Sequence, residues 1–598
     1  MDSTEDSTQK GLENGVFDKE AAVDESSTED QEQNAPVKAE PQEAQKPRGH
    51  GPTEEEEKSR GTGRIALIMF ALGMAVFLAA LDMTIITTAL PTITEHFHSA
   101  SGYIWIGAAY QLAASASTPL WGKISDIWGR KPTLLIANFI FFVGSLVAAV
   151  AVNMGMLIAG RAIQGWGGGG LLVLVNITIG DLFSMRSRGA YYGIIGMVWA
   201  IASALGPIIG GAFTDKVSWR WCFYINLPLD GIAFLIILFV LNLQTPTTPF
   251  WEGVKVIDWV GALTIVGGTL MLLFGLEFGG VTFPWNSATV ICLIVFGIVT
   301  MGLFFLNEWK FAKYPIMPLY IFKYRSNCAA LLVCFIHAYV FISGSYFMPL
   351  YFQASRSQSP LMSGVDLLGF VLALSLSSAA TGIFIRKTGK YLPPIWFGMV
   401  VLTLGFGLFI DLDAHSSWVK VIWFEIVAGL GVGPNFQSPL IALQSLVQPR
   451  DIGSATATFQ FTRNLGVAIS IVIGGVVFQN QMLKKADFLA KELGPEVARQ
   501  LGGNNAGANT AVVNRLPPAQ KNIAQETFAS SLRPDWIMYC AFAGFGLLVS
   551  LLITKQKLTK SHEVTKTGLE AEKERRRMTE EDKARKKAGT PKEGKEDV

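Results

Sequence analysis

Long apolar stretches limit this chain to a membrane-embedded fold. A helix needs about 20 predominantly apolar residues to cross the hydrocarbon core of a bilayer, and fourteen stretches of this kind follow one another between residues 65 and 554. Residues 61–554 carry only 48 Asp, Glu, Lys and Arg side chains, too few to solvate a soluble protein of this length. Since lipid offers the backbone no hydrogen-bond partner, each stretch predicts a transmembrane helix.

The predicted fold class is therefore all-α and integral to the membrane, with fourteen transmembrane helices. The expected spans are residues 65–91, 102–122, 133–152, 155–176, 190–213, 222–243, 257–278, 288–306, 327–352, 364–385, 393–411, 417–441, 452–478 and 535–554. Two tails flank them. The acidic tail, 1–62, has the composition of a disordered segment, and the tail 555–598 alternates basic and acidic residues as a solvated helix does. We expect both tails to be dispensable for the working of the membrane region.

Basic residues in the short loops predict the orientation. Alternate loops contain 14 Lys and Arg residues, whereas the opposite short loops contain four. The more basic loops should face the cytosol, which places both termini there. The long segment 481–533 then lies on the external side, and it begins with an amphipathic stretch over residues 482–501.

Composition excludes several other classes of protein. The formal net charge is only +2, so nucleic acid is not an expected partner. The five cysteines show neither metal-ligand spacing nor a paired framework, so we expect no metal site and no disulfide scaffold. The sequence contains no Walker loop, so we do not expect the protein to hydrolyse ATP. We expect no catalytic residues and no cofactor.

An internal repeat relates the two ends of the membrane region. Gly122 and Gly129 recur as Gly382 and Gly389, 260 residues later. Further pairs at nearly the same offset are Pro91 with Pro349, Arg161 with Glu425, and Gly189 with Gly453. Parallel repeats of this kind build alternating-access carriers, whose substrate site lies between the halves. The predicted organisation is two pseudo-symmetric six-helix bundles, 63–244 and 311–554, with two inserted helices in 245–310.

Several motifs carry a family resemblance. Residues 122–131, GKISDIWGRK, resemble the signature loop of the major facilitator superfamily. Residues 157–167 and 206–211 resemble its fourth-span and fifth-span antiporter motifs. Residues 81–86 and 219–228, LDMTII and WRWCFYINLP, are similar to the fourteen-helix drug:proton antiporter branch. The resemblance covers about residues 64–554, and the long charged tails look like those of fungal toxin and multidrug efflux pumps.

The loop after the second predicted span combines glycines with opposite charges. Gly122 permits close approach of a neighbouring helix, Asp126 can cap a helix N-terminus or pair with a base, and Gly129 allows a tight turn. Basic residues that only fix the loop on the cytosolic side would explain Arg130 and Lys131. They would not explain Asp126, Gly122 or Gly129. The resemblance implies that Gly122, Asp126, Gly129, Arg130 and Lys131 form a conformational latch between the two bundles.

Two charges inside predicted spans are candidates for proton coupling. Arg161 lies near the middle of the fourth span, where insertion scales assign arginine a cost of about 2.5–3.5 kcal/mol. It should therefore face the bundle interior or a water-filled cavity. The resemblance implies a part in proton coupling, and Asp82, late in the first span, is the best candidate for the carboxyl that takes up and releases the proton. A purely structural ion pair is the alternative.

The fifth predicted span contains Gly206, Pro207, Gly210 and Gly211. A proline inside a helix removes a backbone hydrogen bond and bends the helix, and glycines allow close packing. The resemblance ties this kink to antiport, although Ala202 stands where the family motif usually begins with glycine.

Polar residues in other spans could line a large amphipathic cavity between the bundles. The candidates are Gln164, Glu425, Asn435, Gln437, Gln460 and Arg463. Glu277, Asp230 and His337 are weaker candidates, because two lie near span ends and a packing histidine is common.

These features predict a proton-coupled exporter of hydrophobic or amphipathic small molecules, such as fungal secondary metabolites, toxins or fungicides. Its partners would be the substrate, protons and the lipid bilayer, and we expect a monomer in the plasma membrane. The alternative is a vacuolar transporter of basic amino acids or siderophores, which acidic cavity residues would favour. A sensor without transport is a further alternative, but it should have lost the coupling charges.

Overall fold

The computed structural model describes residues 62–99, 102–241, 243, 246–280, 282–502, 510–560 and 567–587. Most of the acidic tail 1–62 and the end of the basic tail lie outside the described residues. The described part is helical, with one isolated β-bridge between Gly279 and Phe283. Its longer helices are α2 (Thr62–His96), α3 (Gly102–Trp128), α4 (Arg130–Ala149), α5 (Met154–Leu182), α6 (Arg188–Lys216), α8 (Asn226–Val240), α10 (Trp259–Phe278), α11 (Ala288–Lys310), α12 (Arg325–Leu350), α14 (Leu368–Thr388), α15 (Leu392–Phe409), α16 (Trp418–Asn435), α18 (Ile452–Lys484), α22 (Pro518–Ser550) and α23 (Leu569–Lys587).

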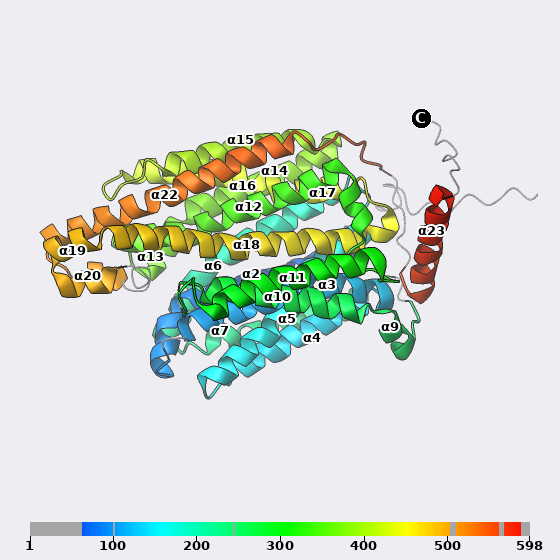
Figure 1. The fold of residues 1–598 in the computed structure, drawn as a ribbon, viewed down its shortest axis with the longest axis horizontal. Coiled ribbons are helices and arrows are strands. Elements are labelled where there is room, and N and C mark those ends of the chain that lie inside the picture. Colours follow the sequence, from blue (N-terminus) through cyan, green and yellow to red (C-terminus); the bar gives the residue numbers. More distant parts are fainter. Residues whose placement is uncertain are drawn as a thin grey trace, which may run out of the picture. The chain divides into compact units, whose positions relative to one another are not determined.

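Short helices connect or extend the long ones (Figure 1). They are α7 (Trp221–Tyr224), α9 (Phe250–Val256), α13 (Pro360–Asp366), α17 (Ser438–Gln444), α19 (Ala486–Leu493), α20 (Pro495–Leu501) and α21 (Thr510–Val513). The predicted external segment 481–533 is thus largely helical where it is described. It lies at the opposite end of the helix bundle from α23 (Figure 1).

Twelve helical stretches in the described part of the chain are long and apolar enough to cross a membrane, against the fourteen predicted. The helices at the predicted second and fourteenth spans, α3 and α22, form but are not among the twelve. Polar side chains lower their apolarity: α3 contains Gln111, Ser115, Ser117 and Thr118, and α22 contains Arg533 and Asp535. The number fourteen and the cytosolic position of the termini remain predictions.

The long helices pack in two groups (Figure 1). In the first, α2 packs against α6 and α8, and α5 packs against α3 and α4. In the second, α16 packs against α14 and α15, and α12 packs against α18 and α22. Two seams join the groups, one between α3 and α18 and one between α6 and α14.

Glycines from equivalent places in the repeat close both seams. A Cβ atom added to Gly122 at the end of α3 would lie 2.7 Å from the Ala457 Cβ in α18. A Cβ added to Gly382 at the end of α14 would lie 3.1 Å from the Ala190 Cα in α6. Contacts this short leave no space for a side chain. The two equivalent glycines therefore let the helix backbones approach closely at both seams.

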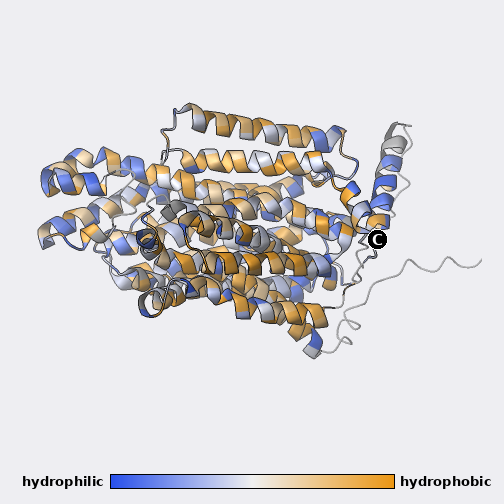
Figure 2. Cartoon of the chain, turned by 90° about the horizontal axis from the view of Figure 1, so that it is seen from below, coloured by the Kyte–Doolittle hydropathy of each residue, from blue (hydrophilic) through white to orange (hydrophobic). Residues whose placement is uncertain are grey.

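The inserted helices α10 and α11 pack against each other, and α10 also contacts α3 and α18. Only 17% of the apolar window of α11 is buried in the protein. Both helices are mostly hydrophobic (Figure 2), which is typical of helices that face lipid, although α11 ends with the polar residues Asn307, Glu308 and Lys310. By contrast, α23 is mostly hydrophilic (Figure 2).

Candidate functional site

The charges predicted within spans meet in the interior of the first helix group. Asp82 on α2 and Arg161 on α5 form an ion pair, and the two side chains are at most 1% exposed. Removing one partner of such a pair leaves an uncompensated buried charge, which costs about 3–5 kcal/mol. Loss of either partner should therefore lower the free energy of unfolding.

Uncharged polar groups complete the surroundings of Asp82. Its Oδ1 accepts hydrogen bonds from Gln164 Nε2 at 2.6 Å and from Asn226 Nδ2 at 3.0 Å. Gln164 Nε2 also donates to Ser145 Oγ at 2.8 Å. Arg161 donates to Gln164 Oε1 at 2.7 Å and, through Nε, to the Ile106 carbonyl at 3.0 Å. Asp82 is therefore bound by side chains of α5 and α8, through one ion pair and two hydrogen bonds.

Glycines in α5 allow α3 to approach this site. A Cβ atom at Gly165 would lie 2.7 Å from the Tyr110 Cα in α3. The Tyr110 ring then lies over the Arg161 guanidinium, 4.6 Å from its centroid, in the geometry of a cation–π contact. Tyr110 thus separates the buried ion pair from the space beyond it.

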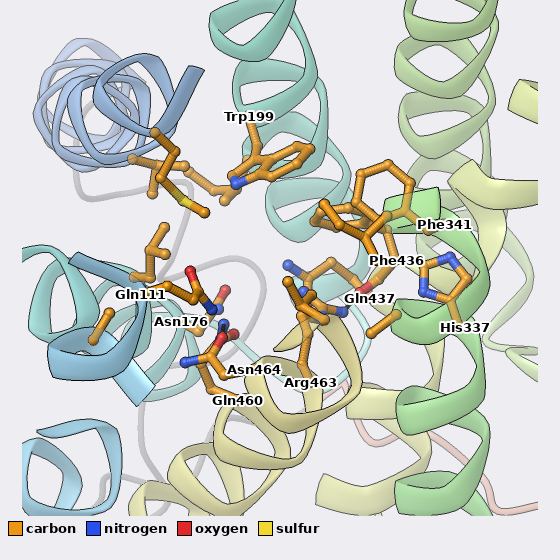
Figure 3. A pocket seen from close by; sticks show the side chains of 18 of the residues that line it. Gln111, Asn176, Trp199, His337, Phe341, Phe436, Gln437, Gln460, Arg463 and Asn464 are labelled. Carbon is orange, nitrogen blue, oxygen red and sulfur yellow. Dashed lines mark hydrogen bonds between the residues drawn. The ribbon is translucent and has the colours of Figure 1, made fainter. Parts of the chain in front are cut away.

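That space is a cavity between the two helix groups. The free space within it is about 70 Å³, less than the roughly 300–1,000 Å³ of sites that hold a drug-sized ligand, so the cavity must widen to bind one. Apolar and aromatic side chains from both groups form most of the wall, among them Tyr110, Trp199, Phe341 and Phe436 (Figure 3). Met83, next to Asp82 in α2, and Tyr110 belong to the wall, so the ion pair lies directly behind it.

Amides, one imidazole and one guanidinium supply the polar part of the wall. Gln111, Asn176, Gln437, Gln460 and Asn464 contribute amides, His337 contributes the imidazole, and Arg463 contributes the cation (Figure 3). Arg463 donates to the Phe436 carbonyl and lies over the Phe436 ring, 4.6 Å from its centroid. Its Nε has no hydrogen-bond partner, nor do Gln437 Oε1 and Asn176 Oδ1. A ligand could satisfy these buried polar atoms.

The predicted lining residues divide between this wall and other places. Gln437, Gln460 and Arg463 line the cavity, whereas Gln164 belongs to the Asp82 site. Asn435 donates to the Ile395 carbonyl at 3.3 Å. Glu425 is fully buried near Gly369, and neither carboxylate oxygen has a hydrogen-bond partner. The sequence pattern could not separate these positions, because helix rotation decides which face meets the cavity.

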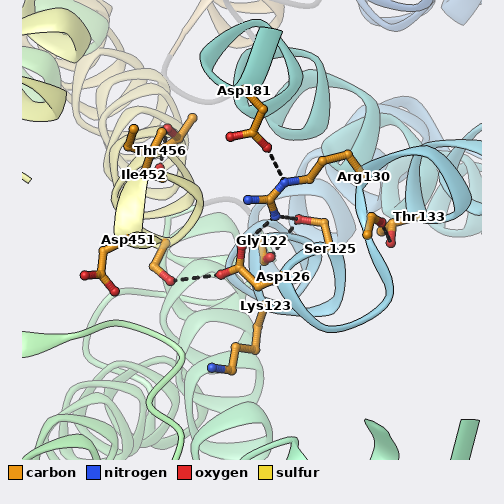
Figure 4. Close-up of polar contacts among 12 residues, drawn as sticks. Gly122, Lys123, Ser125, Asp126, Arg130, Thr133, Asp181, Asp451, Ile452 and Thr456 are labelled. Atoms are coloured by element: carbon orange, nitrogen blue, oxygen red, sulfur yellow. Dashed lines mark hydrogen bonds and ion pairs between the residues drawn. The ribbon is translucent and has the colours of Figure 1, made fainter. Parts of the chain in front are cut away.

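The predicted latch residues lie at the α3–α18 seam (Figure 4). Arg130 donates to Asp126 at 2.5 Å, to Asp181 at 2.6 Å and to Ser125 at 2.6 Å. Asp126 also accepts from Ser454 in the first turn of α18 at 3.4 Å. Gly129, with φ of 92°, makes the turn before α4. Lys131, half-buried, adds a second base beside Arg130. The carboxylate at a helix N-terminus favours the closed seam electrostatically.

The kink residues lie where α6 meets α2. A Cβ atom added to Gly206 would lie 2.7 Å from the Thr84 Cβ, and one at Gly210 would lie 2.6 Å from Thr88 Oγ1. Gly211 faces the other way, with only Leu361 Cδ1 at 3.5 Å. Pro207 lies inside α6, close to Gly364 of α13. The helix that bears Pro207 therefore touches both groups.

Comparison with known proteins identifies the family. The profile of the Major Facilitator Superfamily matches residues 72–471. The chain is a member of the major facilitator superfamily. It is 58% identical over 509 residues to efflux pump dotC of Dothistroma septosporum, covering 85% of this chain and 87% of that protein. It is 36% identical over 525 residues to efflux pump FUS6 of Gibberella moniliformis, covering 86% and 92%.

A solved structure supports the same fold. The human organic anion transporter MFSD10 aligns with a TM-score of 0.51 at 16% identity, covering 82% of this chain and 99% of the other. As a major facilitator with efflux pumps among its relatives, the protein is a multi-pass membrane transporter and not an enzyme. Among the described residues, no group of three or more His, Cys, Asp or Glu side chains could hold a metal ion.

Four residues of the site in this major facilitator were not among those predicted from the sequence. Asn226, Ser145 and Tyr110 surround the Asp82–Arg161 pair, and Asp181 binds Arg130. Asn226 lies within the WRWCFYINLP motif at residues 219–228, so a signal existed but pointed to no partner. Ser145 and Tyr110 carry no charge and therefore no energetic signal in the sequence.

Proposed function

We propose that the protein is a proton-coupled exporter that works by alternating access. The observation that carries this proposal is the buried Asp82–Arg161 pair directly behind the wall of the cavity. Protonation of Asp82 would break its ion pair with Arg161, and movement of Arg161 would release Tyr110, which is part of the wall. Loss of the proton on the other side of the membrane would restore the pair and the wall. Proton binding and substrate binding would thereby favour different states.

The proposed substrates are hydrophobic or amphipathic small molecules. Aromatic and aliphatic side chains form most of the cavity wall, and the amides and Arg463 could satisfy a few polar groups of a ligand. The relatives named as efflux pumps support export as the direction. Secondary metabolites, toxins and fungicides fit this chemistry, and we place the protein in the plasma membrane with both termini in the cytosol.

The cavity wall disfavours the alternative, a vacuolar transporter of basic amino acids. A cationic substrate needs a carboxylate, and none of the described residues of the wall is acidic. The one charged side chain there is Arg463, which would repel such a substrate. A sensor without transport is disfavoured because the Asp82–Arg161 pair and the latch residues are all retained.

The test is transport by the purified full-length protein in liposomes, with an imposed pH gradient and a fluorescent amphipathic substrate. We expect transport to require the gradient, and both Asp82→Asn and Arg161→Ala to abolish the gradient-driven component. Asp230→Asn is the matched control, since Asp230 is also buried in the first group but no ion pair joins it to Arg161. If Asp82→Asn and Arg161→Ala both kept proton-driven transport, the proposed coupling mechanism would be wrong.

A further inference from the structure

The charged helix α23, near the C-terminus, lies against the latch rather than in solvent. The α3–α18 seam closes at Asp126, and α23 packs against α3 and α9 at this place. The Gly568 backbone N–H, just before α23, donates to the Asp126 carbonyl at 2.8 Å. The next N–H, of Leu569, donates to Thr248 Oγ1 at 3.3 Å. Two successive backbone contacts therefore fix the start of this helix.

Side chains of the first turns of α23 enter the ionic network of the latch. Glu572 accepts from Lys123 at 2.7 Å, and each of these side chains is only 2% exposed. Arg575 lies 2.6 Å from Glu572, 3.5 Å from Asp126 and 3.5 Å from Asp451. A surface ion pair contributes little to stability because water screens it, but these pairs are largely excluded from water.

Arg575 contacts both sides of the seam. Asp126 belongs to α3 in the first helix group, and Asp451 immediately precedes α18 in the second. Burial alone would lower the pKa of the Arg575 guanidinium, but the carboxylates of Asp126, Glu572 and Asp451 outweigh burial and raise the pKa above its usual range. Arg575 therefore stays charged at every physiological pH, and its contacts do not depend on protonation.

Beyond Arg575, the ion pairs in the described part of α23 lie within the helix, although the Arg576 guanidinium also lies over the Tyr314 ring, 5.8 Å from its centroid. Arg576 pairs with Glu580, and Arg577 pairs with Glu581, both within the helix. The Arg577 and Glu581 side chains are 72% and 55% exposed. The contrast between Arg575 and Arg577, two residues apart, shows that one face of α23 matches the latch.

We propose that α23 is an autoinhibitory strap that binds across the latch and holds the α3–α18 seam closed. To open the cavity at this end, α3 and α18 must separate, and Arg575 cannot then keep both Asp126 and Asp451. Binding of α23 thus stabilises the state that is closed at this end. Release of the strap lowers the cost of opening. The proposal rests on the proposed role of the latch in alternating access, but its test needs no substrate.

The test measures how often the seam opens. Ala457→Cys places a thiol on α18 opposite Gly122, in full-length protein whose five native cysteines are replaced by alanine, and its rate of labelling by a water-soluble maleimide reports opening. A loss of one or two kcal/mol corresponds to a factor of about 5–30, so we expect Arg575→Ala to raise the labelling rate by about that factor. Arg577→Ala, the matched control, should leave the rate within about twofold.

A second variant separates release of the strap from damage to the fold. Deleting residues 561–598 should raise the labelling rate at least as much as Arg575→Ala. A synthetic peptide of residues 567–587 added in excess should slow it again, whereas the same peptide with Arg575→Ala should not. Equal labelling of the full-length protein, the truncation and the Arg575→Ala variant would overturn the proposal. Fast labelling that the peptide does not slow would also overturn it, whether or not the transporter is proton-coupled.

Discussion

At the scale of single residues, Asp82 and Arg161 compensate each other's buried charge. Each is the other's charged partner, and the amides of Gln164 and Asn226 satisfy only part of their hydrogen bonding. The free energy of either charge therefore depends on whether the other is present.

This dependence can be measured by thermal unfolding in detergent. Arg161→Ala should lower the free energy of unfolding by about 3–5 kcal/mol, since it leaves Asp82 as a buried charge. The double variant Asp82→Asn with Arg161→Gln should be more stable than Arg161→Ala alone, because neither charge remains, although it should not transport protons. A double variant less stable than Arg161→Ala would show that the pair does not act as a coupled unit.

These two residues could be predicted because a charge within an apolar span is costly and demands a partner. Asn226 of α8 and Ser145 of α4 could not be predicted, because Asn226 reaches Asp82, and Ser145 reaches Gln164 and Asn226, only after the helices assemble. For the same reason the sequence pattern placed Gln164, Glu425 and Asn435 in the cavity wall, where the structure does not put them. A residue's type was predictable, but the direction of its side chain was not.

At the scale of helices, close contact between α2 and α6 depends on particular glycines. Gly210→Ala should lower the free energy of unfolding by about 1–3 kcal/mol, the usual cost of overpacking, because the added methyl group would collide with α2 near Thr88. Gly211→Ala, one residue further along the same helix, meets only Leu361 at 3.5 Å and should not destabilise the protein, since alanine is favoured over glycine within a helix by up to about 1 kcal/mol. The comparison uses thermal unfolding of both variants, and equal effects would contradict the contact.

Apolar stretches made the helices of this fold predictable, since lipid permits little else. Helices with polar faces were harder to classify. The sequence of α3 includes Ser115, Ser117 and Thr118, which are fully buried against other helices, so its composition does not reveal whether it meets lipid. The helix pairs that form the two seams, α3 with α18 and α6 with α14, could not be predicted either. An internal repeat predicts that the two halves are similar, but not which of their helices touch.

At the scale of the whole molecule, the orientation predicted from loop charges is open to a direct test. Tags at the two termini should be inaccessible to antibody from outside intact cells, and a tag inserted beside Gln500, in α20, should be accessible. The expected result follows from the excess of basic residues in the alternate loops. If the two termini differed in accessibility, the number of spans would be odd, and the predicted topology would be wrong.

The inserted helices α10 and α11 cover one of the two seams between the helix groups but not the other. Phe461 and Leu465 of α18 and Leu120 of α3 join one apolar cluster with Ala262 and Ile265 of α10, so the inserted pair shields the α3–α18 seam. The α6–α14 seam has no such cover from these two helices. An apolar solute dissolved in the bilayer would thus reach the α6–α14 seam without passing the inserted pair. Entry from the membrane at that seam would then require only that α6 and α14 separate, whereas at the other seam α10 would also have to move.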